Sequence, residues 1–361
     1  MPGTKPWLGG GRVMSSGLAG LDAFVGGGLP LGTMVVVEED GCGGSLTRAL
    51  LGMFLAQAGP SIHRSCVAAP TVAELGTLLG AVPSLASRAD APARAAPLSL
   101  GSAWQYAGFV AAGGDRPAHE REPAAAPAAG PSSFRRSDEP ATGRDAAAPF
   151  CSSFDLDRPV PASAVAGAIR CEHAGVHAGG LNAVHAFLRA GDARPGRAVV
   201  LGLGRGLSGA AAGSRVLAQL RAIRRSLATE RRCVALVTIP PLHERRGAWG
   251  EGASSACLRI GGAVFRLAAF GQEAGAGAVL EAPSGFGKEY SGLLRLARLP
   301  AGPSLVPQQP RGLGGASVLL VRRARRRIAL EPMHLPPEGE DAKPREQSGT
   351  ASLATAMASL A

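Results

Sequence analysis

The sequence predicts an α/β fold in which helices flank a mostly parallel central sheet. Short apolar runs alternate along the chain with glycine-rich turns and helical patterns, an order typical of a helix-covered sheet. One run, Thr33–Val37, is continuously apolar, as in a central strand that is buried on both faces. Apolar residues make up 46% of the 361 positions, which is enough for a sizeable core.

The individual elements follow from the same patterns. A short helix is expected around Leu21–Phe24, before the Thr33–Val37 strand. A second helix begins near Ser45, and its apolar residues recur at helical spacing on one face. A third helix is expected from about Ser214 to Ala228. Further strands are expected at Ala198–Leu203, Cys233–Ile239, Ala263–Leu267, Leu293–Leu299 and Ser317–Val321.

Composition divides the chain into four zones. Residues 1–109 and 150–335 carry the ordered patterning and together form the main domain. Residues 110–149 are Ala, Pro, Gly and Arg with almost no large apolar side chain. Because such a segment cannot bury enough surface to offset its ordering entropy, we expect a disordered insertion there. Residues 336–361 are expected to be a flexible tail.

The formal net charge of +11 permits an anionic partner such as nucleic acid. The charge is weak evidence, however, since only three of the 38 basic residues are lysines and an arginine bias also follows genome composition. Six cysteines without a CxxC pair indicate reduced thiols. The sequence shows neither a signal peptide nor a membrane-length apolar stretch, so we expect a soluble intracellular protein with no membrane contact.

The most informative stretch is SSGLAGLDAFVGGGLPLGTMVVVEEDGCGGS, residues 15–45. A capped turn, a short helix and a glycine turn lead into a buried strand, as at the entry to a RecA/KaiC-type ATPase core. An active loop would then read GxxxxGK[ST], whose backbone N–H groups and lysine hold phosphates. This loop keeps glycines but has no lysine, and three carboxylates beside it would repel a triphosphate. We interpret it as a degenerate phosphate loop in which Ser45 caps the helix, formed by Asp40, Gly41, Gly43, Gly44 and Ser45.

A second strand end agrees with this interpretation. The run AVVLGLGRGLSG, residues 198–209, stands where such ATPases present a metal-binding aspartate, and it ends in glycines with no carboxylate. Both halves of the metal–phosphate machinery are absent together, so independent nucleotide hydrolysis is not expected.

Several blocks, in their shared order, resemble the family of the fourth subunit of the Elongator complex. The resemblance covers nearly all of the patterned chain, and the lysine-free loop fits it. The long Ala/Pro insertion departs from it. The blocks are PGTKP, SSGLAGLD, GGGLPLG, AWQY, FCSSFDL, CVALVTIPPLH and IALEPMHLPPE.

The resemblance implies a RecA-like fold and a non-enzymatic role. It implies assembly with Elongator subunits 5 and 6 into a hetero-hexameric ring, which docks on the catalytic Elongator subcomplex and binds tRNA. The whole complex installs carboxymethyl-type groups on the wobble uridine of tRNA. No cofactor would be bound by this chain alone, although ATP could sit at ring interfaces. Cytoplasmic and nuclear localisation follows from the same resemblance.

Two basic segments are candidates for contact with tRNA. Arg245 and Arg246, with Trp249 as a stacking surface, follow a late core strand, where RecA-like folds contact nucleic acid. An ordinary solvated loop explains them equally well. Arg221, Arg224 and Arg225 line one face of a helix, and that face could meet a neighbouring subunit, RNA or only water. We interpret the run at 322–327 as a solvated sheet edge rather than an RNA contact.

No metal site is expected. Cys171, His173 and His177 lack a fourth ligand nearby, and structural zinc sites take four. The segment GFGKEYSG mimics a phosphate loop but precedes a strand, which indicates a hairpin turn. An alternative function is an ATP-hydrolysing RecA/KaiC relative in DNA recombination or regulation. A further alternative is an interaction protein with no nucleic-acid role.

Overall fold

The computed structural model describes residues 1–7, 10–40, 44–86, 149–161, 164–165, 169–172, 181–207, 211–241, 249, 251–271, 290–300, 318–324 and 326–332. Contacts within the chain separate residues 87–147 from a larger unit made of residues 1–86 and 148–361. The predicted insertion, apart from Pro149, and the predicted tail lie outside the described residues.

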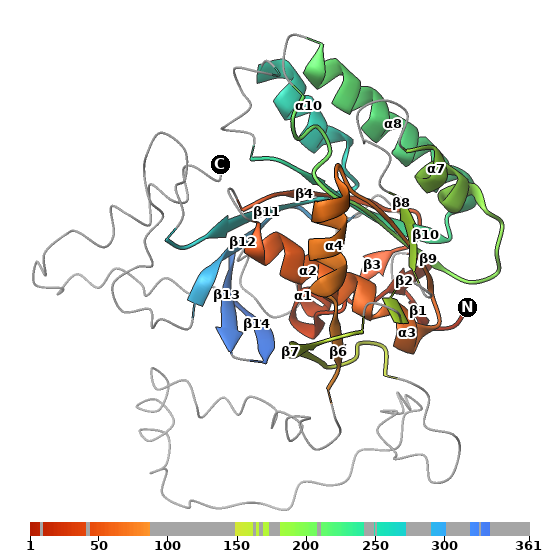
Figure 1. The fold of residues 1–361 in the computed structure, drawn as a ribbon. Helices are drawn as coiled ribbons and strands as arrows, with labels where there is room; N and C mark the ends of the chain where they lie inside the picture. Colours follow the sequence, from red (N-terminus) through yellow and green to blue (C-terminus); the bar gives the residue numbers. More distant parts are fainter. Residues whose placement is uncertain are drawn as a thin grey trace, which may run out of the picture. The chain divides into compact units, whose positions relative to one another are not determined.

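A nine-stranded sheet forms the centre of the larger unit, in the order β14-β13-β12-β11-β4-β10-β9-β5-β8 (Figure 1). The six strands from β11 to β8 are parallel to their neighbours, and β12, β13 and β14 extend the sheet antiparallel. The strands are β4 (Met34–Glu38), β5 (Arg64–Ala68), β8 (Ile169–Glu172), β9 (Gly196–Val200), β10 (Cys233–Ile239), β11 (Ala263–Ala269), β12 (Tyr290–Arg298), β13 (Val318–Ala324) and β14 (Arg327–Pro332).

Helices cover both faces of this sheet (Figure 1). One face packs against α1 (Ala19–Phe24), α2 (Ser45–Ala56) and α4 (Val72–Gly80), and the other against α7 (Asn182–Arg189), α8 (Ala212–Glu230) and α10 (Glu251–Ile260). Side chains alternate along a strand, so Val35 and Val37 of β4 join the first core while Met34 and Val36 join the second. This two-sided burial explains why the run is continuously apolar.

Two small sheets complete the described chain. The first contains β1 (Thr4–Pro6), β2 (Arg12–Met14) and β3 (Leu29–Pro30). The second pairs β6 (Pro83–Leu85) with β7 (Phe154–Pro159), so that Leu85 lies opposite Phe154. The chain therefore leaves the larger unit before residue 87 and returns to it after 148 at neighbouring positions. A single turn, α3 (Ala58–Ser61), follows α2.

The predicted α/β RecA-like fold is confirmed, because a mostly parallel sheet lies between two layers of helices. Every strand and helix expected from the sequence is present, with ends shifted by a few residues. The arginine run lies at the β14 edge, where Arg323 and Arg326 are exposed as predicted. In the described part of the chain, no helix is both long enough and apolar enough to cross a bilayer.

Candidate functional site

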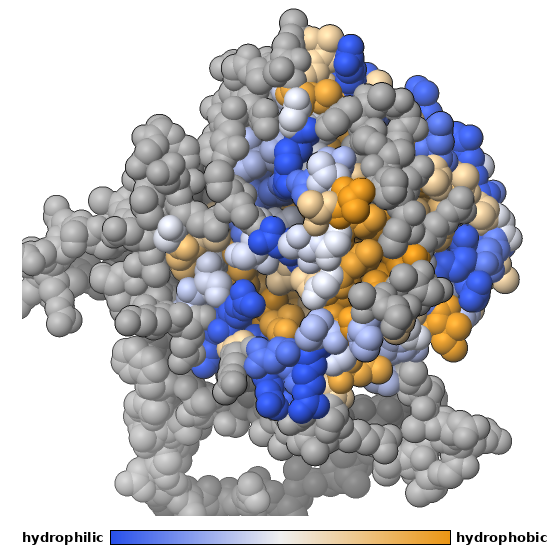
Figure 2. Space-filling view, viewed as in Figure 1, coloured by the Kyte–Doolittle hydropathy of each residue, from blue (hydrophilic) through white to orange (hydrophobic). Residues whose placement is uncertain are grey.

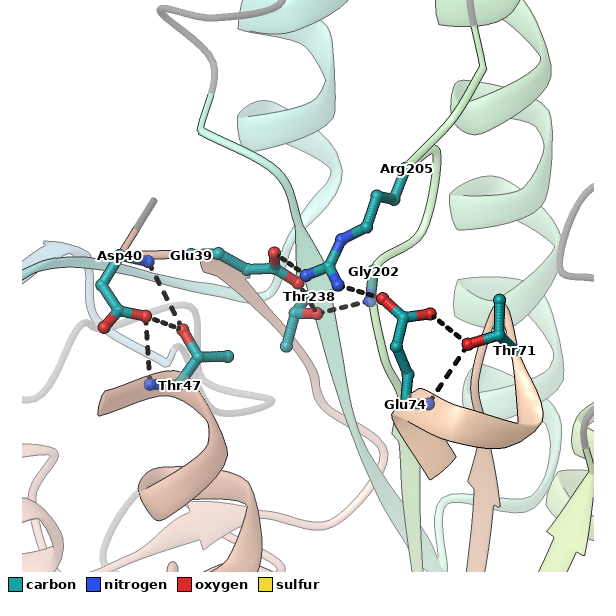
Figure 3. A network of polar contacts seen from close by, with 8 residues as sticks. All are labelled: Glu39, Asp40, Thr47, Thr71, Glu74, Gly202, Arg205 and Thr238. Atoms are coloured by element: carbon teal, nitrogen blue, oxygen red, sulfur yellow. Dashed lines mark hydrogen bonds and ion pairs between the residues drawn. The ribbon is translucent and has the colours of Figure 1, made fainter. Parts of the chain in front are cut away.

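The degenerate phosphate loop lies at the carboxyl end of β4, where parallel α/β sheets form their ligand sites. Asp40 occupies the amino terminus of α2 (Figure 3). Its carboxylate accepts hydrogen bonds from the Leu46 amide at 3.0 Å and the Thr47 amide at 3.3 Å, and from the Thr47 hydroxyl at 2.7 Å. In an active loop, backbone N–H groups at the helix start hold phosphate, and a hydroxyl there binds magnesium. In this chain the Asp40 carboxylate accepts hydrogen bonds from these groups instead.

The expectation that Ser45 caps the helix is wrong. α2 begins at Ser45, and its N-cap is Gly44 at φ 49°. Glycine has no side chain that could cap the helix. Asp40, four positions before Gly44, does the capping instead. Gly41 and Gly43 lie outside the described residues.

Asp40→Ala should therefore lower the free energy of unfolding by about 1–2 kcal/mol, because the first amides of α2 and the buried Thr47 hydroxyl lose their acceptor. The matched control is Ser45→Ala, for which we expect less than about 0.5 kcal/mol. Chemical denaturation of both variants measures the difference. Equal losses in the two variants would contradict the capping role of Asp40.

Arg205 ties together four elements beside the loop (Figure 3). It stands in the turn after β9, where an active ATPase would carry its metal-binding carboxylate. Its guanidinium forms ion pairs with Glu39 at the end of β4 and Glu74 in the first turn of α4. The Thr238 hydroxyl, at the end of β10, donates to the other oxygen of Glu39 at 2.5 Å and accepts from the Gly202 amide at 2.7 Å. Burial lowers the pKa of Arg205, but the two carboxylates outweigh it and raise the pKa above its ordinary value.

All three acidic residues of the loop have partners within the chain. Glu38 pairs with Arg266 of β11 at 3.1 Å, Glu39 with Arg205, and Asp40 with the start of α2. From the sequence alone, these carboxylates were expected to be free negative charges that repel a triphosphate. In the structure, arginines compensate the charges of Glu38 and Glu39. Asp40 accepts the hydrogen bonds at the start of α2 that could otherwise hold an anion.

A small cavity remains in front of the loop. Its volume is about 60 Å³, and its lining includes Thr47, Arg48, Glu74, Thr77 and Arg205. That space suits a few water molecules, whereas sites for drug-sized ligands measure some 300–1,000 Å³. The described residues contain no group of three His, Cys, Asp or Glu side chains able to hold a metal ion. The cavity formed by the described residues is therefore much smaller than a nucleotide site.

A second polar network is buried near the amino end of β9. Arg197 is fully buried and donates to His63 Nδ1 at 3.1 Å, to the Ser15 carbonyl at 2.8 Å and to the Phe54 carbonyl at 3.1 Å. Its guanidinium also lies 4.6 Å from the centre of the Phe54 ring. Asp22 accepts from the Ser15 hydroxyl at 2.5 Å and the Ser16 amide at 2.7 Å. This network joins the amino-terminal segment to the central sheet.

Burial shifts the pKa values in this network toward the neutral forms. It raises the pKa of Asp22, against the opposing hydrogen bonds from Ser15 and Ser16. It lowers the pKa of Arg197 to about 9, and, together with the nearby Arg197 charge, that of His63 to about 4. His63 is thus neutral at pH 7, with Nδ1 accepting from Arg197 and Nε2 placed 3.0 Å from the Pro2 carbonyl.

Protonation of His63 should make the protein less stable as the pH falls. Because the pKa of His63 is about 4 in the folded chain and about 6.5 when unfolded, the unfolded state binds more protons in between. We expect the titration of His63 to lower the free energy of unfolding by about 2 kcal/mol between pH 7 and pH 5. In His63→Asn this part of the pH dependence should disappear, which urea denaturation at several pH values measures. An unchanged slope would rule out His63 as the titrating group.

The structure corrects the role predicted for Trp249. Its side chain is 3% exposed and packs in the core between the sheet and α8, so its ring is not available for base stacking. Gly204, at φ +84°, and Gly213 leave the room for it, since a Cβ at Gly204 would collide with the indole ring. Arg245 and Arg246 lie outside the described residues. Arg221, Arg224 and Arg225 are exposed on α8, as their spacing predicted.

Comparison with known proteins identifies the family. The sequence model of the PAXNEB protein family matches residues 1–360. The chain belongs to the PAXNEB protein family. A zebrafish (Danio rerio) protein named Elongator complex protein 4 is 47% identical over 58 residues, which cover 16% of this chain and 14% of that protein. A Xenopus laevis protein of the same name is 41% identical over 69 residues, 19% of this chain and 17% of its own length. These matches confirm the resemblance inferred from the sequence blocks.

In this PAXNEB chain, three of those blocks meet at the Arg197 network. PGTKP contributes the Pro2 carbonyl beside His63, and SSGLAGLD contributes Ser15 and Asp22. FCSSFDL contributes Ser152, whose backbone amide donates a hydrogen bond to the side-chain oxygen of the buried Gln57 at 2.8 Å. The shared blocks thus include residues that hold the fold together, separate from the phosphate-loop site.

Proposed function

We propose that this chain is a non-catalytic subunit of the Elongator complex. Its membership of the PAXNEB family and the names of its relatives support that role. The observation that carries the non-catalytic part is the hydrogen bonding of Asp40, which binds two amides that could hold a phosphate and the Thr47 hydroxyl that could bind magnesium. We therefore assign no catalytic residue and no independently bound cofactor to the chain.

The same proposal includes the assembly. The chain would join Elongator subunits 5 and 6 in a hetero-hexameric RecA-like ring that docks on the catalytic subcomplex. Through that ring it would support tRNA binding and the carboxymethyl-type modification of the wobble uridine, in the cytoplasm and nucleus. Any ATP would bind at ring interfaces, with the phosphate donors supplied by another subunit, because the donors of this chain are already used.

An affinity pull-down of the tagged chain from its native cells tests the proposal. Mass spectrometry should identify two RecA-like paralogues together with the catalytic Elongator subunits. Recovery of the chain alone, or with DNA recombination proteins, would overturn the proposal. A parallel measurement of ATP binding to the purified chain should detect no saturable binding, since Asp40 and the Arg205 ion pairs occupy the loop.

A further inference from the structure

The outer face of α8 is strongly basic. The helix α8 carries four arginines and one acidic residue, Glu230, at its last position. The inner side packs into the core through Val216, Leu220, Ile223 and Leu227. In Figure 2, hydrophilic side chains line the upper right rim of the molecule, where Figure 1 places α8. The exposed residues of the helix are Ser214, Arg215, Ala218, Arg221, Arg224, Arg225, Ala228 and Thr229.

The arginines of this outer face differ from most others in the described residues in their ion pairing. In the described part of the chain, Arg215, Arg221, Arg224 and Arg225 form no ion pair, and the one hydrogen bond among their side chains is a 3.4 Å contact from Arg224 to the Ile260 carbonyl. By contrast, Arg64, Arg194, Arg205 and Arg266 all pair with carboxylates.

Three of these charges also repel one another. Arg221 precedes Arg224 by three positions and Arg225 by four, so the side chains are neighbours on the helix surface. Each like-charge pair at this spacing costs an isolated helix about 0.2–0.5 kcal/mol. An anion bound across the three would remove that cost.

The chemistry of the face favours a phosphate backbone over a protein partner. The centres of stable protein interfaces combine arginines with large apolar or aromatic side chains. The residues exposed between the arginines are Ala, Ser and Thr, which offer no such anchor. A nucleic-acid backbone can be bound by neutralising its phosphate charges. Arg221 and Arg225 place two positive charges about 6 Å apart along the helix axis, where they can act on the same stretch of backbone.

We propose that the outer face of α8 binds the phosphate backbone of RNA, with Arg221, Arg224 and Arg225 as the central contacts. The choice of RNA rests on the proposed function, and the choice of surface rests on the charges described above. Binding of this kind is independent of base sequence and depends strongly on salt concentration.

Binding of the full-length chain to an unmodified tRNA transcript tests the surface. The variant R221Q/R224Q/R225Q should bind roughly ten-fold or more weakly, and the slope of log affinity against log salt should shrink by about 2–3. The matched control is R158Q/R323Q/R326Q, which removes the same charge from exposed positions on β7 and the β13–β14 turn. Equal losses in the two variants, or no loss in either, would refute the proposal.

Folding and assembly are measured alongside. The α8 variant should keep its melting temperature within a few degrees, because it loses repulsive pairs and, apart from them, only the long, exposed Arg224 contact. In cells, a pull-down with the α8 variant should recover the same protein partners as the unchanged chain but less tRNA. Loss of partners with tRNA retained would show that α8 docks a protein instead. Absence of the Elongator partners from both pull-downs would reject the proposed function while leaving the in vitro tRNA result as a separate test of α8.

Discussion

Replacing Arg197 with alanine should lower the free energy of unfolding by about 4–5 kcal/mol. The guanidinium is fully buried and binds the Ser15 and Phe54 carbonyls and His63 Nδ1. Alanine would leave these acceptors without a donor, at about 1–3 kcal/mol for each one that stays dry, and would open a cavity below the Phe54 ring. A loss of this size stands out from most substitutions and has an identified cause.

Two further variants separate charge from volume. Arg197→Met fills much of the same space and removes the buried charge, so we expect a smaller loss of about 1–3 kcal/mol from the unpaired carbonyls alone. Arg194→Ala, three residues earlier, removes a side chain that is 55% exposed, and it should cost less than about 1 kcal/mol. Chemical denaturation gives all three values. If Arg197→Ala lowers the free energy of unfolding no more than Arg194→Ala does, the stabilising role of the buried Arg197 is contradicted.

Arg205→Ala should cost about 2–4 kcal/mol, most of it through Glu39. The Glu39 side chain is only 2% exposed, and without Arg205 a buried carboxylate would keep the Thr238 hydroxyl but lose its cation. We place the loss below that of a fully buried pair because Arg205 is itself 36% exposed and solvent can partly replace it.

A double variant provides an independent check. Adding Glu39→Gln to Arg205→Ala removes the buried charge that Arg205 compensates, so it should restore part of the lost stability. A double variant as unstable as Arg205→Ala would mean that Glu39 is not the source.

The sequence predicted the fold well where strands are buried on both faces. Cys233–Ile239 forms β10 with the predicted ends, because all seven residues are buried and six of them are apolar. β5 was not predicted, since Arg64 and Ser65 interrupt its apolar pattern. β14 was not predicted either, because an edge strand is only partly buried and its residues are mixed.

The contacts of the loop after β4 could not be predicted from the sequence. The absent lysine predicts a degenerate phosphate loop, but nothing local showed that Asp40 accepts hydrogen bonds from the start of α2. Arg205 and Arg197 were missed because their partners come from distant parts of the sequence. A weak signal existed in each case: Arg197 is a charged residue directly before a buried strand run, and Arg205 is the one charged residue in a glycine-rich turn. Trp249 was misjudged because two glycines make room for it in the core.

The pairing of β6 with β7 has a consequence for how this protein can vary in length. Leu85 and Phe154 lie opposite each other, so the chain between them starts and ends at neighbouring positions on the larger unit. For a flexible connection, the entropy of closure changes by only about 0.6 kcal/mol for each doubling of its length. By this rule, residues added or removed between these two strands should change the free energy of unfolding of the larger unit very little.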